Sequence, residues 1–142
     1  MNRPPFFKYN VFSEFTTIAL AASLSDNLIL KTDKRLIDEG YRYKIEGDLI
    51  SEKEIDLTDL DKGLYVTGYI KAGRSIKAGR SIKAGRSIEA GWSIEAGSYI
   101  KAGSYIKAGG SIEAGHFIKA GHFIKAGRFI KAGGSIEARH SI

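Results

Sequence analysis

Apolar and polar positions recur with a period of six over the C-terminal half of the chain. Isoleucine stands at every sixth position from Ile70 to Ile142, where it heads a repeated phrase of the type IKAGRS. Within each hexad, Ile and the Ala two residues later share one side of an extended strand, and the Lys or Glu between them points the other way. A helix of about 3.6 residues per turn would spread these isoleucines around its whole circumference. The pattern therefore predicts a parallel β-solenoid with Ile and Ala inside and the charged residues facing solvent.

Glycine follows Ala at the fourth position in eleven of the twelve hexads that run from Ile70 to Ser141. A glycine at a fixed place after a short strand is typical of a corner, and we expect a positive φ there because only glycine adopts it at little cost. Each hexad then forms one short strand and one corner.

These hexads resemble those of the hexapeptide-repeat parallel β-helices, and the resemblance covers residues 64–142. In that family three hexads form one triangular coil, which implies that positions three hexads apart stack, as Tyr99 would on Phe117 and Tyr105 on Phe123. The hexad differs from the family's usual form, because its small residue comes two positions after the aliphatic one rather than two before. A coil of two hexads stays open as an alternative, since it would place oppositely charged residues in an alternating column that includes Lys77, Glu89, Lys101, Glu113, Lys125 and Glu137.

Residues 1–63 lack the repeat and predict a small α+β cap on the solenoid. Apolar residues spaced by three and four positions favour an amphipathic helix over residues 11–24, and the short apolar run 28–32 favours a strand. Strict alternation from Tyr41 to Glu46 predicts a half-buried strand. We therefore expect a mainly β protein with a cap domain at 1–63 and the solenoid domain at 64–142.

The charge differs sharply between these two parts. Residues 1–63 hold nine Lys/Arg and twelve Asp/Glu, a net charge of −3, whereas residues 64–142 hold thirteen and four, a net charge of +9. Cysteine is absent from the chain, so nothing indicates an oxidising compartment, and we expect a cytoplasmic protein without cofactor or metal. No apolar run approaches the about 20 residues that a membrane-spanning helix needs.

The fifth position of the hexad is the outward one that is free to vary, within a variable window at the fourth to sixth positions, so a partner-binding surface would be encoded there. Arg, Trp and Tyr dominate the energetics of protein interfaces. The candidates of these types are Arg74, Arg80, Arg86, Trp92, Tyr99 and Tyr105. The alternative is that recently duplicated hexads simply share an arginine.

The sequence favours a non-enzymatic binding protein that docks on a macromolecular partner. Acyltransferases of the hexapeptide-repeat class use a histidine and a long projecting loop, but nothing interrupts this array around His116 or His122. The overall plan resembles small accessory proteins of phages and mobile elements, including anti-CRISPR proteins, which implies a nucleic-acid-handling protein complex as partner. A self-assembling β-helix similar to bactofilins and direct nucleic-acid binding through the basic array are the alternatives.

The last hexads predict self-association. An open strand edge and an exposed apolar cross-section template pairing with another chain. We therefore expect a homodimer through the C-terminal coil, with Ile136 and Ile142 in the contact.

Overall fold

The computed structural model describes residues 17–19 and 33–142, and these residues form strands and no helix. The strands are β1 Thr17–Ala19, β2 Ile37–Asp38, β3 Arg42–Ile45, β4 Asp48–Ser51, β5 Ile55–Leu57, β6 Gly63–Val66, β7 Ile70–Ala72, β8 Ile76–Ala78, β9 Ile82–Ala84, β10 Ile88–Ala90, β11 Ile94–Ala96, β12 Ile100–Ala102, β13 Ile106–Ala108, β14 Ile112–Ala114, β15 Ile118–Ala120, β16 Ile124–Ala126, β17 Ile130–Ala132 and β18 Ile136–Ala138. A helix that could cross a membrane is accordingly not found in this part of the chain.

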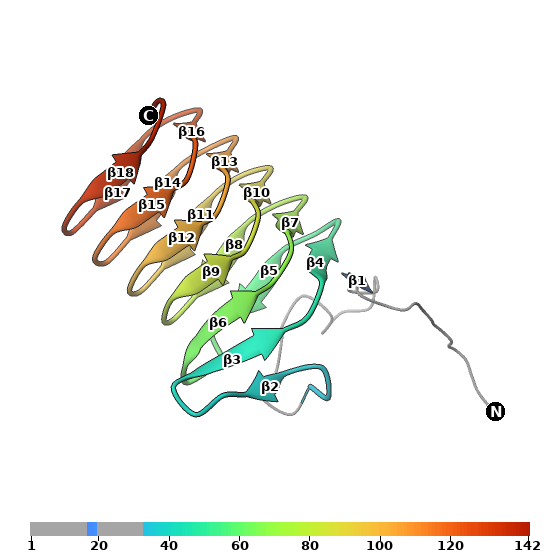
Figure 1. Ribbon diagram of the computed structural model, residues 1–142. Helices are drawn as coiled ribbons and strands as arrows, with labels where there is room; N and C mark the ends of the chain where they lie inside the picture. Colours follow the sequence, from blue (N-terminus) through green and yellow to red (C-terminus); the bar gives the residue numbers. More distant parts are fainter. Residues whose placement is uncertain (1–16, 20–32) are drawn as a thin grey trace.

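The strands wind into a rod of stacked coils, and each coil gives one strand to each of three parallel sheets (Figure 1). Sheet A has the order β1-β4-β7-β10-β13-β16, sheet B has β17-β14-β11-β8-β5, and sheet C has β18-β15-β12-β9-β6-β3-β2. The final pair of sheet C, β2 with β3, is antiparallel. The expected mainly β, parallel solenoid is confirmed.

One coil contains three hexads. Ile88 pairs with Ile70 on one side and with Ile106 on the other, a register of three hexads that the other repeat strands share. The coil of two hexads is therefore wrong. Tyr99 stacks on Phe117 with ring centroids 4.8 Å apart, and Tyr105 stacks on Phe123 at 5.0 Å, as the three-hexad coil predicts.

The interior is a column of isoleucines flanked by alanines. From Ile70 to Ile118 every repeat isoleucine is fully buried, and the alanines of sheets A and C are almost as well covered. Burying one Ile side chain stabilises the fold by about 1.5 to 3 kcal/mol, and neighbouring coils add such terms one after another. The core is therefore thin but continuous along the rod.

The coil continues N-terminal to Leu64, into residues that the sequence assigns to the cap. β3, β4 and β5 pair in parallel with β6, β7 and β8, and Ile45, Leu49 and Ile55 are buried in the same core as the repeat isoleucines. The strand predicted at 41–46 is confirmed as β3. The irregular spacing of these strands is absorbed by loops such as 58–62, where Leu60 is buried and Asp61 accepts a hydrogen bond from the Tyr43 hydroxyl.

The α+β cap expected over residues 1–63 is not confirmed, because its described residues contain no helix. The helix predicted over 11–24 is wrong at Thr17–Ala19, which form β1 and pair in parallel with β4. The β-branched Thr17 and Ile18 suit a strand, and the edge of β4 offers them backbone partners. The rest of that predicted helix and the strand predicted at 28–32 lie outside the described residues.

The repeat glycines are required for a different reason from the one the sequence suggests. The glycines with positive φ in the described chain are Gly40 and Gly47, neither of which belongs to the hexads, so the expected positive φ at the corners is wrong. Space is the constraint instead. A Cβ built on Gly91 would lie 2.1 Å from the carbonyl oxygen of Gly73 in the preceding coil, and most repeat glycines meet a carbonyl in the same way. Glycine lets consecutive corners approach closely enough to hydrogen-bond.

Candidate binding site at the corner after sheet A

The fifth residues of the hexads form three columns along the rod, one at each corner. In each column the backbone N–H of one fifth residue donates to the carbonyl of the fifth residue one coil earlier, as Trp92 does to Arg74 at 3.0 Å. We name the columns by the sheet that they follow. Corner A holds Arg74, Trp92, Gly110 and Arg128, corner B holds Arg80, Ser98, His116 and Gly134, and corner C holds Gly68, Arg86, Ser104, His122 and His140.

Corner A presents a large exposed aromatic side chain between two arginines. Trp92 is 61 % exposed, and the Arg74 guanidinium lies over its ring, with its central carbon 5.4 Å from the ring centroid. Because Arg74 covers one face of the indole, the other face looks toward the next layer of the column. That layer is Gly110, which has no side chain, and Arg128 follows one layer further on.

A hollow of about 370 Å³ lies at this empty layer. Its lining comes from two successive corners and the arginine beyond them: Gly91, Trp92, Ser93, Gly109, Gly110, Ser111 and Arg128. The hollow thus has an aromatic wall, a cationic wall and a floor of glycine and serine. None of the described residues that line it carries a carboxylate.

Corner C is filled where corner A is open. The Arg86 guanidinium lies 4.6 Å from the ring centroid of Tyr69, and the rings of His122 and His140 stack at 5.5 Å. Ser104 Oγ lies 3.2 Å from His122 Nδ1, so these two consecutive layers of the column are also in contact. Side chains in this column therefore satisfy one another from coil to coil.

Of the six predicted binding residues, the structure brings together only Arg74 and Trp92. Arg80 lies at corner B and Arg86 at corner C. Tyr99 and Tyr105 are half-buried in the two aromatic stacks, where they serve the packing of corners B and C. Gly110 and Arg128 were missed, although the signal is present: AGG stands three hexads after AGW and three hexads before AGR.

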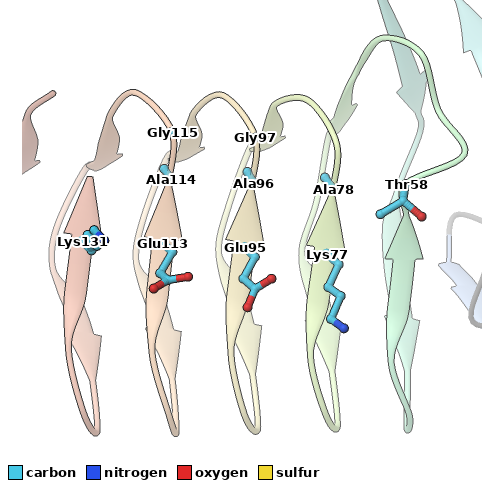
Figure 2. Close-up of a pocket in the computed structure, with 10 residues that line it drawn as sticks. All are labelled: Thr58, Lys77, Ala78, Glu95, Ala96, Gly97, Glu113, Ala114, Gly115 and Lys131. Carbon is cyan, nitrogen blue, oxygen red and sulfur yellow. The ribbon is translucent and has the colours of Figure 1, made fainter. Parts of the chain in front are cut away.

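The three sheets also differ in the charges that they present. The outward residues of the repeat strands number three lysines and one glutamate on sheet A, two of each on sheet B, and three lysines and one glutamate on sheet C. Figure 2 shows the sheet B face, where Lys77, Glu95, Glu113 and Lys131 follow one another on successive strands. They border a shallow groove of about 420 Å³ floored by alanine and glycine. Its charges balance, so this face selects no sign of charge in a partner.

Sheet C carries a column of lysines in consecutive layers. Lys101 pairs in register with Lys83 and with Lys119. Burial lowers the pKa of Lys83, and the neighbouring positive charges of Lys101 and Arg42 lower it further. The Lys83 ammonium lies 5.1 Å from the Tyr65 ring centroid and so has a partial aromatic partner. At the far end of the column Lys119 is paired with Glu137, with 3.6 Å between its Nζ and the carboxylate oxygen.

The histidines lie on the outside of corners B and C rather than in a cleft. Ser98 Oγ is 3.1 Å from His116 Nδ1, which repeats the serine–histidine contact of corner C. Nucleophilic catalysis needs a third group that orients the imidazole. Among the described residues no carboxylate forms an ion pair with these imidazoles, and no group of side chains is suited to hold a metal ion.

The last coil carries the residues predicted for self-association. Ile142 is 64 % exposed and Ile136 is partly exposed, and both line a hollow beside β18. Self-association through these residues stays a prediction, as does assembly of the bactofilin type.

Comparison of the chain with protein-family models, with curated proteins and with solved structures found no match. The likeness to hexapeptide-repeat β-helices therefore rests on the three-sheet coil and its register of three hexads.

Proposed function

We propose that this chain is a non-catalytic docking protein that presents corner A to a protein complex. The observation that carries the proposal is the exposed Trp92, held between Arg74 and the hollow at Gly110. Tryptophan and arginine are the residues that contribute most where protein interfaces are tightest, and they do so in pockets that lose their water on binding. Corner A has both residue types and such a pocket.

The rest of the solenoid supports this use as a rigid mount. Each coil is hydrogen-bonded to its neighbours along all three sheets and at the corners, so the residues of corner A keep their spacing without a partner. A site that is ordered beforehand loses less conformational entropy on binding.

The narrower form of the proposal concerns the partner. The net charge of +9 over residues 64–142 complements an acidic surface, and the likeness in overall plan to phage accessory proteins favours a nucleic-acid-handling complex. In this form the chain is a cytoplasmic inhibitor of a bacterial defence complex such as CRISPR–Cas. It would act by occupying a surface rather than by chemistry.

An affinity capture with matched corner variants tests the docking function. The chain is immobilised and exposed to a bacterial lysate treated with nuclease, and bound proteins are identified by mass spectrometry. We expect a protein that the wild type captures, that Trp92→Ala loses and that His122→Ala keeps, since His122 has the same hexad position at corner C. Capture that survives Trp92→Ala, or no capture at all, contradicts the proposal.

A further inference from the structure

The empty layer at Gly110 has the dimensions of a stacking slot. Parallel strands lie about 4.8 Å apart, so the walls formed by Trp92 and Arg128, two layers apart, are separated by about 9.6 Å. A flat ring inserted midway would lie about 4.8 Å from each wall. The aromatic stacks within this rod have that spacing, with ring centroids 4.8 and 5.0 Å apart and planes parallel to within 3°.

Both walls favour an aromatic guest. The free face of the Trp92 indole offers stacking, and the Arg128 guanidinium offers a planar cation for the other side of the ring. Corner A already contains one such pairing, because Arg74 covers the opposite face of the same indole. A guest would therefore extend an existing column of flat groups by one member.

The charges beside the slot indicate that the molecule with the aromatic ring also carries negative charge. Lys107 lies on the strand of the Gly110 layer and Lys125 on the strand of the Arg128 layer, and both residues are exposed. Neither forms an ion pair with a carboxylate among the described residues, whereas Lys71 on the same face is paired with Glu89. Beside the slot the rod thus presents the cations of Lys107, Lys125 and Arg128. None of the three forms an ion pair in the described part of the chain, although Glu89 stands in register beside Lys107 on β10.

We propose that corner A binds single-stranded nucleic acid, with one base in the slot between Trp92 and Arg128. A nucleotide supplies a flat ring and a phosphate in one unit, and stacking on aromatic side chains beside a cationic track is how single strands bind without sequence preference. Arg128 stacks on the far side of the inserted base, and Lys107 and Lys125 contact the neighbouring phosphates. This activity goes beyond docking on a protein and does not require it.

Trp92 is the one tryptophan of the chain, so its fluorescence reports on the slot directly. The probe is an oligothymidylate of about 15 nucleotides, titrated at about 20 mM salt and about pH 8, where an imidazole of ordinary pKa is neutral. We expect the base to quench the fluorescence. A duplex of the same length produces little quenching, because its bases are already stacked.

Two glycines provide a matched pair of variants. Gly110→His fills the slot with the side chain that His116 and His122 carry at this position, and we expect affinity to fall on the order of ten-fold. A Cβ at Gly110 would lie 2.8 Å from the carbonyl oxygen of Trp92, and one at Gly134 would lie 2.8 Å from that of His116, so both corners must shift by a similar amount. Gly134→His makes the same change at corner B, and its affinity stays within about two-fold of the wild type. Thermal unfolding of each variant shows that the rod is intact.

A second pair separates the cationic wall from general charge. Arg128→Gln weakens binding several-fold and makes it less sensitive to salt, whereas Arg80→Gln at corner B has a smaller effect on both. Equal losses at Gly110→His and Gly134→His, or at Arg128→Gln and Arg80→Gln, show only diffuse attraction of phosphates and overturn the slot. Absence of quenching, with capture from nuclease-treated lysate that still depends on Trp92, assigns the slot to a protein side chain; it overturns this inference and leaves the docking function in place.

Discussion

Two columns of residues run along the rod, one within the strands of sheet A and one at the corner that follows them. They differ in direction, in residue type and in burial. The column of Ile70, Ile88 and Ile106 points inward, repeats one residue type and is fully buried. The corner A column points outward and changes at every layer, from Arg74 to Trp92 to Gly110 to Arg128. The first column holds the coils together and the second is available for recognition, so substitutions in the two should affect different measurements.

Replacing a buried isoleucine has the largest expected effect. Ile106→Asp places a carboxylate in a closed apolar layer and removes the contacts of a fully buried side chain, a combined cost of more than about 5 kcal/mol. That is comparable to the whole stability of a domain, so we expect the chain to lose its cooperative unfolding transition in circular dichroism.

The control for this substitution is Lys107→Asp, which adds the same carboxylate one residue later on an exposed position. We expect it to change the free energy of unfolding by about 0.5 kcal/mol or less. A folded Ile106→Asp chain with an unchanged melting temperature contradicts the inward column.

Adding a methyl group at a repeat glycine has the next largest effect. The Cβ of Gly97→Ala would lie 2.2 Å from the carbonyl oxygen of Gly79, so the corner must shift, at a cost of about 1 to 3 kcal/mol. At Gly79 itself the nearest atom is the carbonyl oxygen of Thr58, 3.8 Å away. Gly79→Ala should therefore be neutral or stabilise by about 0.4 to 1 kcal/mol, because alanine restricts the unfolded chain. Equal losses in urea unfolding at both sites would refute the close-approach explanation of the corner glycines.

The stack between Tyr105 and Phe123 is expected to contribute less to the free energy of unfolding than Gly97→Ala removes. A double-mutant cycle with Tyr105→Ala and Phe123→Ala should give a coupling free energy of about 0.5 to 1.5 kcal/mol. The two rings stack only if positions three hexads apart are neighbours. A coupling of zero would mean that the rings do not meet in solution.

Removing the Trp92 side chain has the smallest expected effect on stability. The indole is mostly exposed and its contact with Arg74 lies in solvent, so Trp92→Ala should change the free energy of unfolding by about 0.5 kcal/mol or less. A loss as large as that at Gly97 would show that corner A is part of the framework rather than free for recognition.

The repeat predicts the solenoid well because every hexad has the same need to bury its Ile and Ala on one side of a short strand. Ile70 to Ile142 repeat without a gap, so their inward direction can be predicted before any coordinates. The repeat alone left a coil of two hexads open, and the resemblance to hexapeptide-repeat β-helices favoured three, which the strand register confirms. The earlier coil could not be read in this way. There Tyr43 and Leu49 stand where the repeat has Ile, and only Ile55 keeps it. Gly47 and the loop 58–62 break the spacing, although the strands pair in parallel with the next coil.

The candidate site was only half visible from the sequence. Arg74 and Trp92 stand out by residue type, whereas one glycine among the many of the repeat does not. Gly110 becomes informative only once the three-hexad register places it between Trp92 and Arg128. The role of the corner glycines was hidden for a similar reason, since the carbonyl that excludes a Cβ comes from the preceding coil.

The central claim is that recognition depends on where an outward side chain stands along the corners, while the inward column holds the fold. Its most direct test moves the indole from corner A to corner C in the double variant Trp92→Ser with Ser104→Trp, which keeps the composition and charge of the chain unchanged. The measurement is capture of partner protein from nuclease-treated lysate. We predict that this variant keeps a cooperative melting transition, with a small loss from the Ser104–His122 contact, and that it loses capture. Capture at the wild-type level by this variant would contradict the account.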